Sequence, residues 1–220
     1  MTRLYFIRHG KTEWNNDGRF QGANGDSPLL PESYHQIKQL GAHLKHVKFA
    51  HAWSSPLARA RRTAENTLSL LDDQPALTLS SGLIEFSVGS WEGQMFADVQ
   101  AKQPQQYDAW RNHPDQFDAK QVLGAETFEA VQLRFQHTVK QAIASYGGDD
   151  VNLIFFGHGM LLTIGMESLL QTPLSQIRAR GGLGNTSTSI LETKDNVNFT
   201  EIIRNDTSYL DVQADASNTI

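Results

Sequence analysis

The chain has 220 residues, of which 39% are hydrophobic and 20% are charged, so it can form one large α/β domain with a sizeable core. Its formal net charge of -5 at pH 7 argues against a general affinity for nucleic acid or anionic membranes, and the lack of cysteine excludes disulfides and thiolate metal sites. No apolar run approaches the ~20 residues of a membrane span, and no signal-peptide pattern opens the chain, so the sequence favours a cytoplasmic protein.

Short apolar runs alternate with segments of helical period along the chain. A strand is predicted over residues 4–7, followed by a Gly-, Asn- and Asp-rich loop over 14–31. Further helices are predicted over 34–47, 57–71, 128–143 and 161–170, and further strands over 51–54, 77–79, 151–156, 189–191 and 199–203. The repeated strand-then-helix order predicts a mostly parallel sheet covered by helices on both faces.

The domain organisation expected from this pattern is simple. Residues 1–210 are expected to form a single domain, into which the polar, amphipathic segment of about 94–123 is inserted as a small helical cap. Residues 211–220 read as a polar C-terminal tail that is loosely held.

Two of the predicted strands end on a histidine next to glycine. The first strand stops at RHG (8–10), and the strand over 151–156 stops at GHG (157–159). In open parallel sheets ligands bind beyond the carboxyl ends of the strands, and glycine lets a ligand approach the backbone closely. A lone histidine there is usually only a polar residue ending a buried segment. Two of them, His9 and His158, with an arginine beside one, favour a binding site.

Arg59 and Glu85 are the other candidate site residues suggested by their surroundings. Arg59 falls in the first turn of a predicted helix, where free N–H groups and the helix dipole favour anions and a guanidinium matches phosphate geometry. Glu85 follows Leu83 and Ile84, and a carboxyl group among apolar residues is more easily protonated, as a general acid must be. Taken alone, each residue also fits a solvated surface position.

A metal site is the weaker alternative. Two histidines and a carboxylate suit an iron site, but Arg8 beside His9 would place a fixed cation next to a dication. Zinc-protease spacing, a P-loop and a GxGxxG turn after the first strand are all absent from the sequence. No metal and no cofactor is therefore expected.

Two imidazoles, two guanidiniums and one carboxyl group together suit phosphoryl transfer. Fixed cations stabilise the negative charge of the transition state. A neutral imidazole can hold the phosphoryl group covalently, and a carboxylic acid can protonate the departing alkoxide.

Six motifs in chain order resemble the histidine phosphatase superfamily, in its phosphoglycerate mutase-like branch: RHGKTEWN, GRFQG, SSPLARARRTA, LIEFSVGSWEG, GAET and GHG. The resemblance extends from Leu4 to about Leu191. It implies a doubly wound α/β sandwich with its pocket at the strand ends. It also implies a phosphatase that hydrolyses a small phosphorylated metabolite through a phosphohistidine intermediate.

The resemblance implies a role for each residue that matches a motif. The expected catalytic residues are His9 as nucleophile, Glu85 as proton donor and later base, and His158, which also borders the phosphate. The remaining positions are expected to bind: Arg8, Asn15 and Arg59 the phosphate, Gln21 and Gly22 the substrate.

Two alternative functions remain open, and the substrate and oligomeric state are not identified. A cofactor-dependent phosphoglycerate mutase is the runner-up, although residues 94–123 carry only three cations against four aspartates. A non-catalytic phospho-ligand binding module is less favoured, because such a module usually lacks part of the catalytic set. Lys11, where many family members carry Glu or Gln, and the altered 21–26 loop bear on which substrate is accepted.

Overall fold

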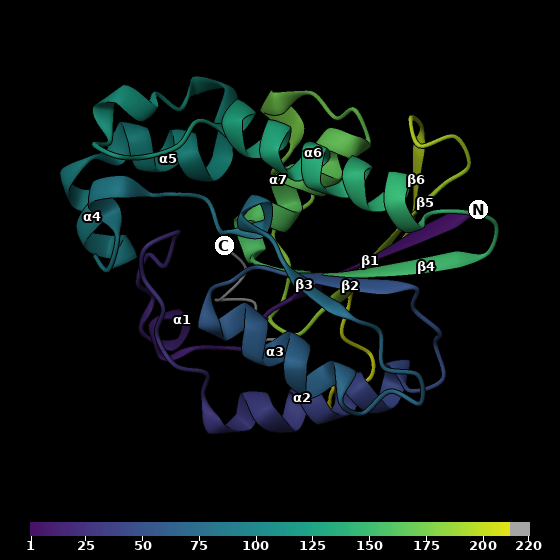
Figure 1. Ribbon diagram of the computed structural model, residues 1–220. Coiled ribbons are helices and arrows are strands. Elements are labelled where there is room, and N and C mark those ends of the chain that lie inside the picture. Colours follow the sequence, from purple (N-terminus) through teal and green to yellow (C-terminus); the bar gives the residue numbers. More distant parts are fainter. Residues whose placement is uncertain (212–220) are drawn as a thin grey trace.

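A six-stranded sheet forms the centre of the protein, whose computed structural model describes residues 1–211 (Figure 1). The strands lie in the order β3-β2-β4-β1-β5-β6. Their bounds are Thr2–Arg8 (β1), His51–Ser54 (β2), Leu77–Leu79 (β3), Val151–Gly157 (β4), Thr188–Thr193 (β5) and Phe199–Asp206 (β6). Strands β1 to β4 run parallel, whereas β5 and β6 pair antiparallel.

Helices cover both faces of this sheet. In Figure 1, α2 (Pro31–Leu44) and α3 (Ala58–Leu68) lie below it, and α6 (Phe128–Tyr146) and α7 (Gly159–Leu169) lie above it. The layer with α6 and α7 buries the larger core, around Phe135, Phe155 and Leu161. The opposite layer is smaller and is built on Ile7, Leu40 and similar side chains. Because both faces are covered, β4 is a nearly continuous apolar run rather than an alternating one.

Two short helices, α4 (Phe96–Lys102) and α5 (Pro104–Asn112), lie beside the α6–α7 layer (Figure 1). Trp110 of α5 is 2% exposed and packs edge-on against Phe20, with ring centroids 5.2 Å apart. The segment between the Trp91 turn and α6 thus contributes aromatic side chains to the same core as the first loop. The interpretation of this segment as a cap inserted into a single domain remains a prediction.

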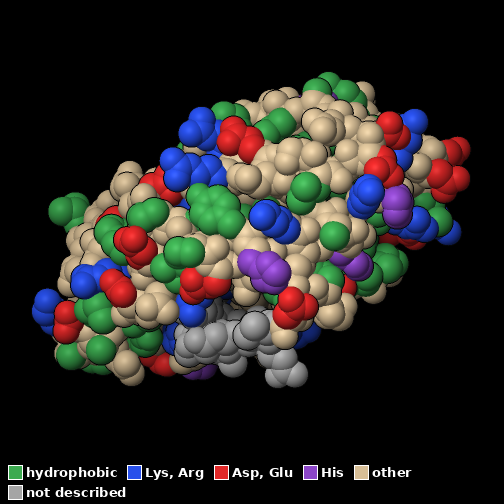
Figure 2. All heavy atoms as spheres, turned by 90° about the horizontal axis from the view of Figure 1, so that it is seen from below, with side chains coloured by type: hydrophobic (Ala, Val, Ile, Leu, Met, Phe, Trp, Pro, Cys, Tyr) green, Lys and Arg blue, Asp and Glu red, His purple; other side chains and the backbone are tan. Residues whose placement is uncertain are grey.

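The surface matches the near-balanced composition. On the face shown in Figure 2, acidic, basic and hydrophobic side chains are interspersed rather than gathered into one basic patch. Within residues 1–211, no helix is long and apolar enough to cross a membrane.

The elements expected from the sequence are largely confirmed, with a few differences at loops and ends. A short helix, α1 (Glu13–Asp17), overlaps the start of the predicted 14–31 loop. A capping box between Thr12 and Asn15 caps its N-terminus. The helix expected over 57–71 ends at Leu68, and Leu71, whose apolar side chain extended the prediction, is buried in the bend beyond it. The expected C-terminal tail, apart from Asp211, lies outside the described residues.

Candidate active site

The parallel pairing of β1 with β4 brings the two strand-end histidines together. Arg8 pairs with Gly157 at the ends of the strands, and the N–H of His9 donates to the carbonyl of Gly157 at 3.0 Å. The ring centroids of His9 and His158 lie 5.1 Å apart. Two residues separated by most of the chain therefore share one edge of the sheet.

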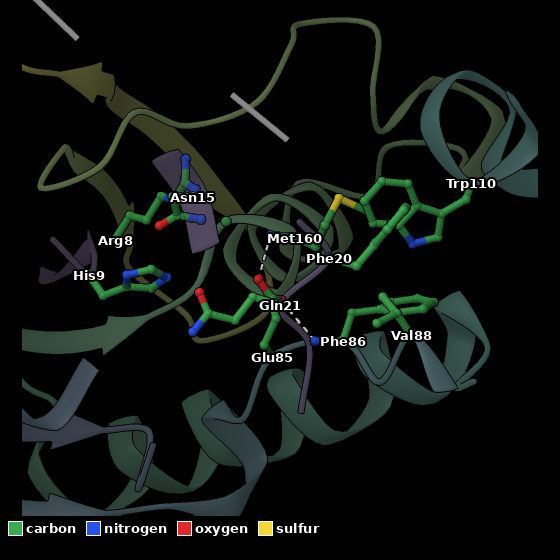
Figure 3. A pocket seen from close by; sticks show the side chains of 11 residues that line it. Arg8, His9, Asn15, Phe20, Gln21, Glu85, Phe86, Val88, Trp110 and Met160 are labelled. Atoms are coloured by element: carbon green, nitrogen blue, oxygen red, sulfur yellow. Dashed lines mark hydrogen bonds between the residues drawn. The ribbon is translucent and has the colours of Figure 1, made fainter. Parts of the chain in front are cut away.

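His9 is held in one tautomer by its own loop. Its Nδ1 lies 2.7 Å from the carbonyl of Gly10, and since a carbonyl only accepts, Nδ1 carries the proton. The lone pair then resides on Nε2, and the ring points into the pocket in Figure 3. Burial, together with the charges of Arg59 and Arg8, holds the pKa of His9 well below its usual range. The imidazole is consequently neutral, as a nucleophile requires.

His158 is also buried and neutral. Its Nε2 lies 2.8 Å from the hydroxyl of Ser55, and its Nδ1 has no hydrogen-bond partner. Ser55 Oγ also accepts from the N–H of Leu57, so this hydroxyl ties the His158 ring to the start of α3. Burial is the largest cause of the lowered pKa of His158, followed by the charge of Arg59.

The carboxyl group of Glu85 lies against the N-terminus of α7. Its carboxyl oxygens accept from the backbone N–H of Leu161 at 2.7 Å, and from those of Phe86 at 2.8 Å and Met160 at 3.2 Å, which Figure 3 marks with dashes. These bonds and the charge of Arg59 favour the ionised form, yet burial outweighs them and raises the pKa of Glu85. The carboxyl group is therefore easier to protonate than an exposed glutamate, as expected for a proton donor.

Arg8 and Asn15 line the same pocket as His9 and Glu85. The Arg8 guanidinium donates to the carbonyl of Leu183. Burial lowers the pKa of Arg8 to about 10, so the side chain remains a cation at neutral pH. Asn15 Oδ1 accepts from the backbone of Thr12 at 3.2 Å, which ties the residue to the cap of α1.

Arg59 stands behind the pocket rather than on its wall. Its guanidinium donates to the carbonyls of Gly25 at 2.6 Å and Gly22 at 2.9 Å, and it pairs with Asp26 at 3.3 Å. The carboxylate of Asp26 also accepts from the first N–H groups of α3, at Ala58 and Arg59. In this conformation Arg59 anchors the 22–26 loop, and its charge acts on His9 and Glu85 from there.

The two expected substrate contacts differ in position. Gln21 lines the pocket, and its amide lies between His9 and Glu85 in Figure 3. Its Oε1 accepts from the hydroxyl of Thr12, while its Nε2 is buried without a partner. Gly22 lies beneath the wall, where a Cβ would come within 2.6 Å of the carbonyl of Phe86. Only glycine allows this close backbone approach.

Five apolar side chains complete the wall, and the sequence did not single them out as site residues. They are Phe20, Phe86, Val88, Trp110 and Met160, and the pocket contains about 400 Å³ of empty space, including its open mouth. Phe86 and Val88 follow Glu85 directly, so their place beside it could have been inferred from that motif. Trp110 is distant in sequence from every motif and gives no such signal. Across residues 1–211, no three histidine or acidic side chains are grouped so that they could hold a metal ion.

Comparison with known proteins identifies the family. The sequence profile of the histidine phosphatase superfamily (branch 1) matches residues 4–206. The chain belongs to this superfamily. The α/β fold and the family expected from the six motifs are thereby confirmed.

Similar proteins include both phosphatases and a mutase. Adenosylcobalamin/alpha-ribazole phosphatase of Salmonella typhimurium is 31% identical over 175 residues, which cover 80% of this chain and 83% of that protein. The protein named "Probable phosphoglycerate mutase GpmB" of Salmonella paratyphi A is 26% identical over 174 residues, covering 79% and 77%. The native structure of mycobacterial glucosyl-3-phosphoglycerate phosphatase superposes with a TM-score of 0.81 at 27% identity, covering 92% of this chain and 98% of that chain. These relatives support a phosphatase that acts on a small phosphorylated metabolite.

Proposed function

We propose that the protein hydrolyses a small phosphomonoester through a covalent intermediate on His9. One observation carries the proposal: the Nδ1–Gly10 hydrogen bond leaves the lone pair on Nε2 of a neutral imidazole, in a pocket lined by Arg8 and Glu85. Nucleophile, cation and acid thus share one small cavity, which is the arrangement that phosphoryl transfer requires.

The first step transfers the phosphoryl group to the enzyme. His9 Nε2 attacks phosphorus, the bond between phosphorus and the ester oxygen breaks, and protonated Glu85 gives its proton to the departing alkoxide. The products are phosphohistidine, the free alcohol and ionised Glu85.

The second step releases inorganic phosphate. Water attacks phosphorus, ionised Glu85 takes a proton from that water, and the bond between phosphorus and Nε2 breaks. His9 returns to its neutral form and Glu85 to its protonated form, so that the cycle closes.

Three further side chains have supporting roles in this proposal. Arg8, on the pocket wall, offsets the charge of the transferred phosphoryl group. His158 keeps Nε2 on the hydroxyl of Ser55, and in this proposal its unpartnered Nδ1 donates to a phosphoryl oxygen. Arg59 contributes its charge from behind the 22–26 loop. Because these fixed groups supply the positive charge, we expect hydrolysis without a metal ion. We also propose that the enzyme acts in the cytoplasm.

The test is a screen of phosphorylated metabolites and p-nitrophenyl phosphate for release of inorganic phosphate. We expect turnover by the wild-type protein and a loss of nearly all of it in His9→Ala. The matched control is His137→Ala, an exposed histidine on α6 that is remote from the pocket wall. Turnover by His9→Ala near the wild-type rate would refute the proposal.

Phosphoglycerate mutase activity is the second candidate, and the pocket wall disfavours it. Among the described residues that line the pocket, Arg8 is the one lysine or arginine, and five lining residues are apolar. A bisphosphoglycerate intermediate carries two phosphate groups and a carboxylate, and its second phosphate would be poorly held there while the molecule reorients. An enolase-coupled assay with added 2,3-bisphosphoglycerate should therefore show little interconversion of 3- and 2-phosphoglycerate. Mutase turnover well above the hydrolysis rate would reverse this ranking.

A further inference from the structure

The apolar side of the pocket contains a hydrogen-bond donor with no acceptor. Trp110 is 2% exposed and lines the pocket, yet its indole Nε1 is buried without a partner. Figure 3 shows that nitrogen on the side of the ring facing Phe86 and Val88. Buried polar groups are nearly always hydrogen-bonded in folded proteins, so an orphan donor on a pocket wall indicates an acceptor on the ligand.

A guanidinium without a counter-ion packs against the same wall. Arg178 lies with its Cζ 6.0 Å from the ring centroid of Trp110, and one of its Nη atoms lies 2.9 Å from the sulfur of Met160. Its Nε donates to the carbonyl of Arg111 at 3.1 Å. Within residues 1–211, Arg178 makes no ion pair with any carboxylate. A thioether is a weak acceptor, so the protein gives this guanidinium one carbonyl and no carboxylate as direct partners within the described residues.

Arg178 is partly buried, so an anion brought by a ligand would stabilise its charge. Burial and the neighbouring charge of Arg111 lower the pKa of Arg178 to about 10, against the raising influence of Glu85, so the group still carries its charge at neutral pH. Met160, which separates Arg178 from the cavity, is an unbranched and flexible side chain that can yield to a ligand. A carboxylate on the substrate would thus gain both the Trp110 N–H and the guanidinium.

We propose that Trp110 and Arg178 are specificity-determining residues, and that they select phosphomonoesters whose alcohol portion carries a carboxylate. The inference rests on the proposed phosphatase function, because it assigns the alcohol side of the same pocket. The phosphoryl group lies at His9 and Arg8, the carbon skeleton packs on Phe86 and the neighbouring apolar side chains, and the carboxylate faces Trp110. A hydrogen bond between charged groups is stronger than one between neutral groups, so a carboxylate is preferred over a neutral acceptor.

The experiment compares two esters that differ only in this group: 3-(phosphonooxy)propanoate and its primary amide. The amide keeps the chain length, the leaving group and a carbonyl acceptor but removes the negative charge. For the wild-type protein we expect kcat/KM to be about 10- to 100-fold higher for the carboxylate, expressed mainly as a lower KM, as a charge-assisted contact of this kind provides.

Two variants and one control then assign the preference. Arg178→Met keeps the packing on Trp110 and should reduce the carboxylate-to-amide ratio to less than about three-fold. Trp110→Phe keeps an aromatic ring and should lower kcat/KM for the carboxylate by about 5- to 10-fold through KM. Arg111→Met removes a neighbouring cation without altering the carbonyl that Arg178 uses, and should keep the wild-type ratio. Thermal unfolding of each variant verifies that it folds.

A second measurement separates this inference from the proposed function. Calorimetric binding of the two esters to His9→Ala gives the same comparison without any turnover. Tighter binding of the carboxylate ester than of the amide to His9→Ala, with this difference lost when Arg178→Met is added, supports the inference even if neither ester is hydrolysed. Equal binding of the two esters, or a wild-type ratio retained by Arg178→Met, would overturn it.

Discussion

At the residue scale, Glu85 is subject to two opposing influences. Three backbone N–H groups and Arg59 stabilise its carboxylate, whereas burial destabilises it, and burial prevails. The raised pKa means that the group is protonated at a higher pH than a surface glutamate and can serve as a proton donor. Once it is ionised, the N–H groups hold the carboxylate in place to act as a base. The same environment therefore suits both proposed steps.

Replacing Glu85 with Gln should separate esters by their leaving groups. The amide fits the same space but donates no acidic proton, so alkyl phosphates should lose about 10²–10⁴-fold in kcat/KM, the range typical of general acid catalysis. Phenolic leaving groups depart without protonation, so p-nitrophenyl phosphate should lose much less in single-turnover phosphorylation of the enzyme. An equal loss for both classes in that step would remove Glu85 from the role of acid.

The two buried histidines should make stability depend on pH. His9 and His158 have lowered pKa values in the folded state, whereas the unfolded chain binds protons at each of them near pH 6.5. As pH falls below about 6.5, protons bind preferentially to the unfolded chain, so the free energy of unfolding decreases, by up to ~1.4 kcal/mol per pH unit for each histidine. Above that pH this contribution is fully present.

The variant His9→Gln provides the measurement. Urea unfolding between pH 5 and pH 7.5 should show a shallower decline in the free energy of unfolding for His9→Gln than for wild type, because one of the two protons is no longer involved. Replacement of the exposed His137 by Gln is the control and should leave the slope unchanged. Identical slopes for wild type and His9→Gln would show that His9 titrates normally in the fold.

At the element scale, helix α6 holds the loop that carries Glu85. Arg134 on α6 donates to the carbonyls of Gly82 at 3.0 Å, Ile84 at 2.5 Å and Glu85 at 3.2 Å, and it pairs with Glu126 at 2.9 Å. Glu126 in turn accepts from the N–H of Ser87. Neither residue lines the pocket, and both contact the backbone of the loop, so this pair positions the loop that carries Glu85.

Arg134→Met should loosen that loop without removing any pocket side chain. We expect a loss of ~2 kcal/mol in the free energy of unfolding, because three carbonyls lose a charged donor, and a fall of about ten-fold in kcat for alkyl esters. A smaller fall for p-nitrophenyl phosphate would show that the acid is misplaced. Lys140→Met, at an exposed position of the same helix, is the control. Unchanged kcat with lowered stability would make Arg134 purely structural.

The parts of the site that sequence could predict are those tied to strand ends and local motifs. His9 and His158 follow apolar runs, and parallel pairing of those runs necessarily places them together. The partners that orient them were not predictable, because they depend on contacts between distant segments. Ser55 meets His158 across 103 residues of sequence. Arg59 illustrates the same limit, since its guanidinium anchors the 22–26 loop rather than standing on the pocket wall.

The apolar wall shows a further limit of sequence patterns. Trp110 and Met160 belong to helices whose apolar residues read equally well as core, and both indeed pack in the main core cluster. Only the three-dimensional structure shows that part of each side chain also borders the cavity. The antiparallel β5 and β6 were predicted as strands, but their direction is set by chain connections that apolar patterns do not encode.

At the scale of the whole molecule, the fold gathers fixed positive charge at one end of the sheet. Arg8 at the end of β1 and Arg59 at the start of α3 both lower the pKa of His9, and both interact with the charge of Glu85. A divalent ion supplies similar charge in many phosphotransferases, so none should be needed here. After dialysis against EDTA the protein should keep most of its original phosphatase activity. Its abolition, followed by restoration with a divalent ion, would return a metal to the mechanism.

The central claim is that His9 becomes phosphorylated during turnover, and rapid quenching of the reaction with a ³²P-labelled ester in alkaline SDS tests it most directly. The account predicts a protein-bound label that is stable in base and labile in acid, and peptide mapping should locate it at His9. The label should form during the initial burst of alcohol release, and it should be absent from His9→Ala. Hydrolysis at the full rate with no such adduct, or an adduct that persists in His9→Ala, would contradict it.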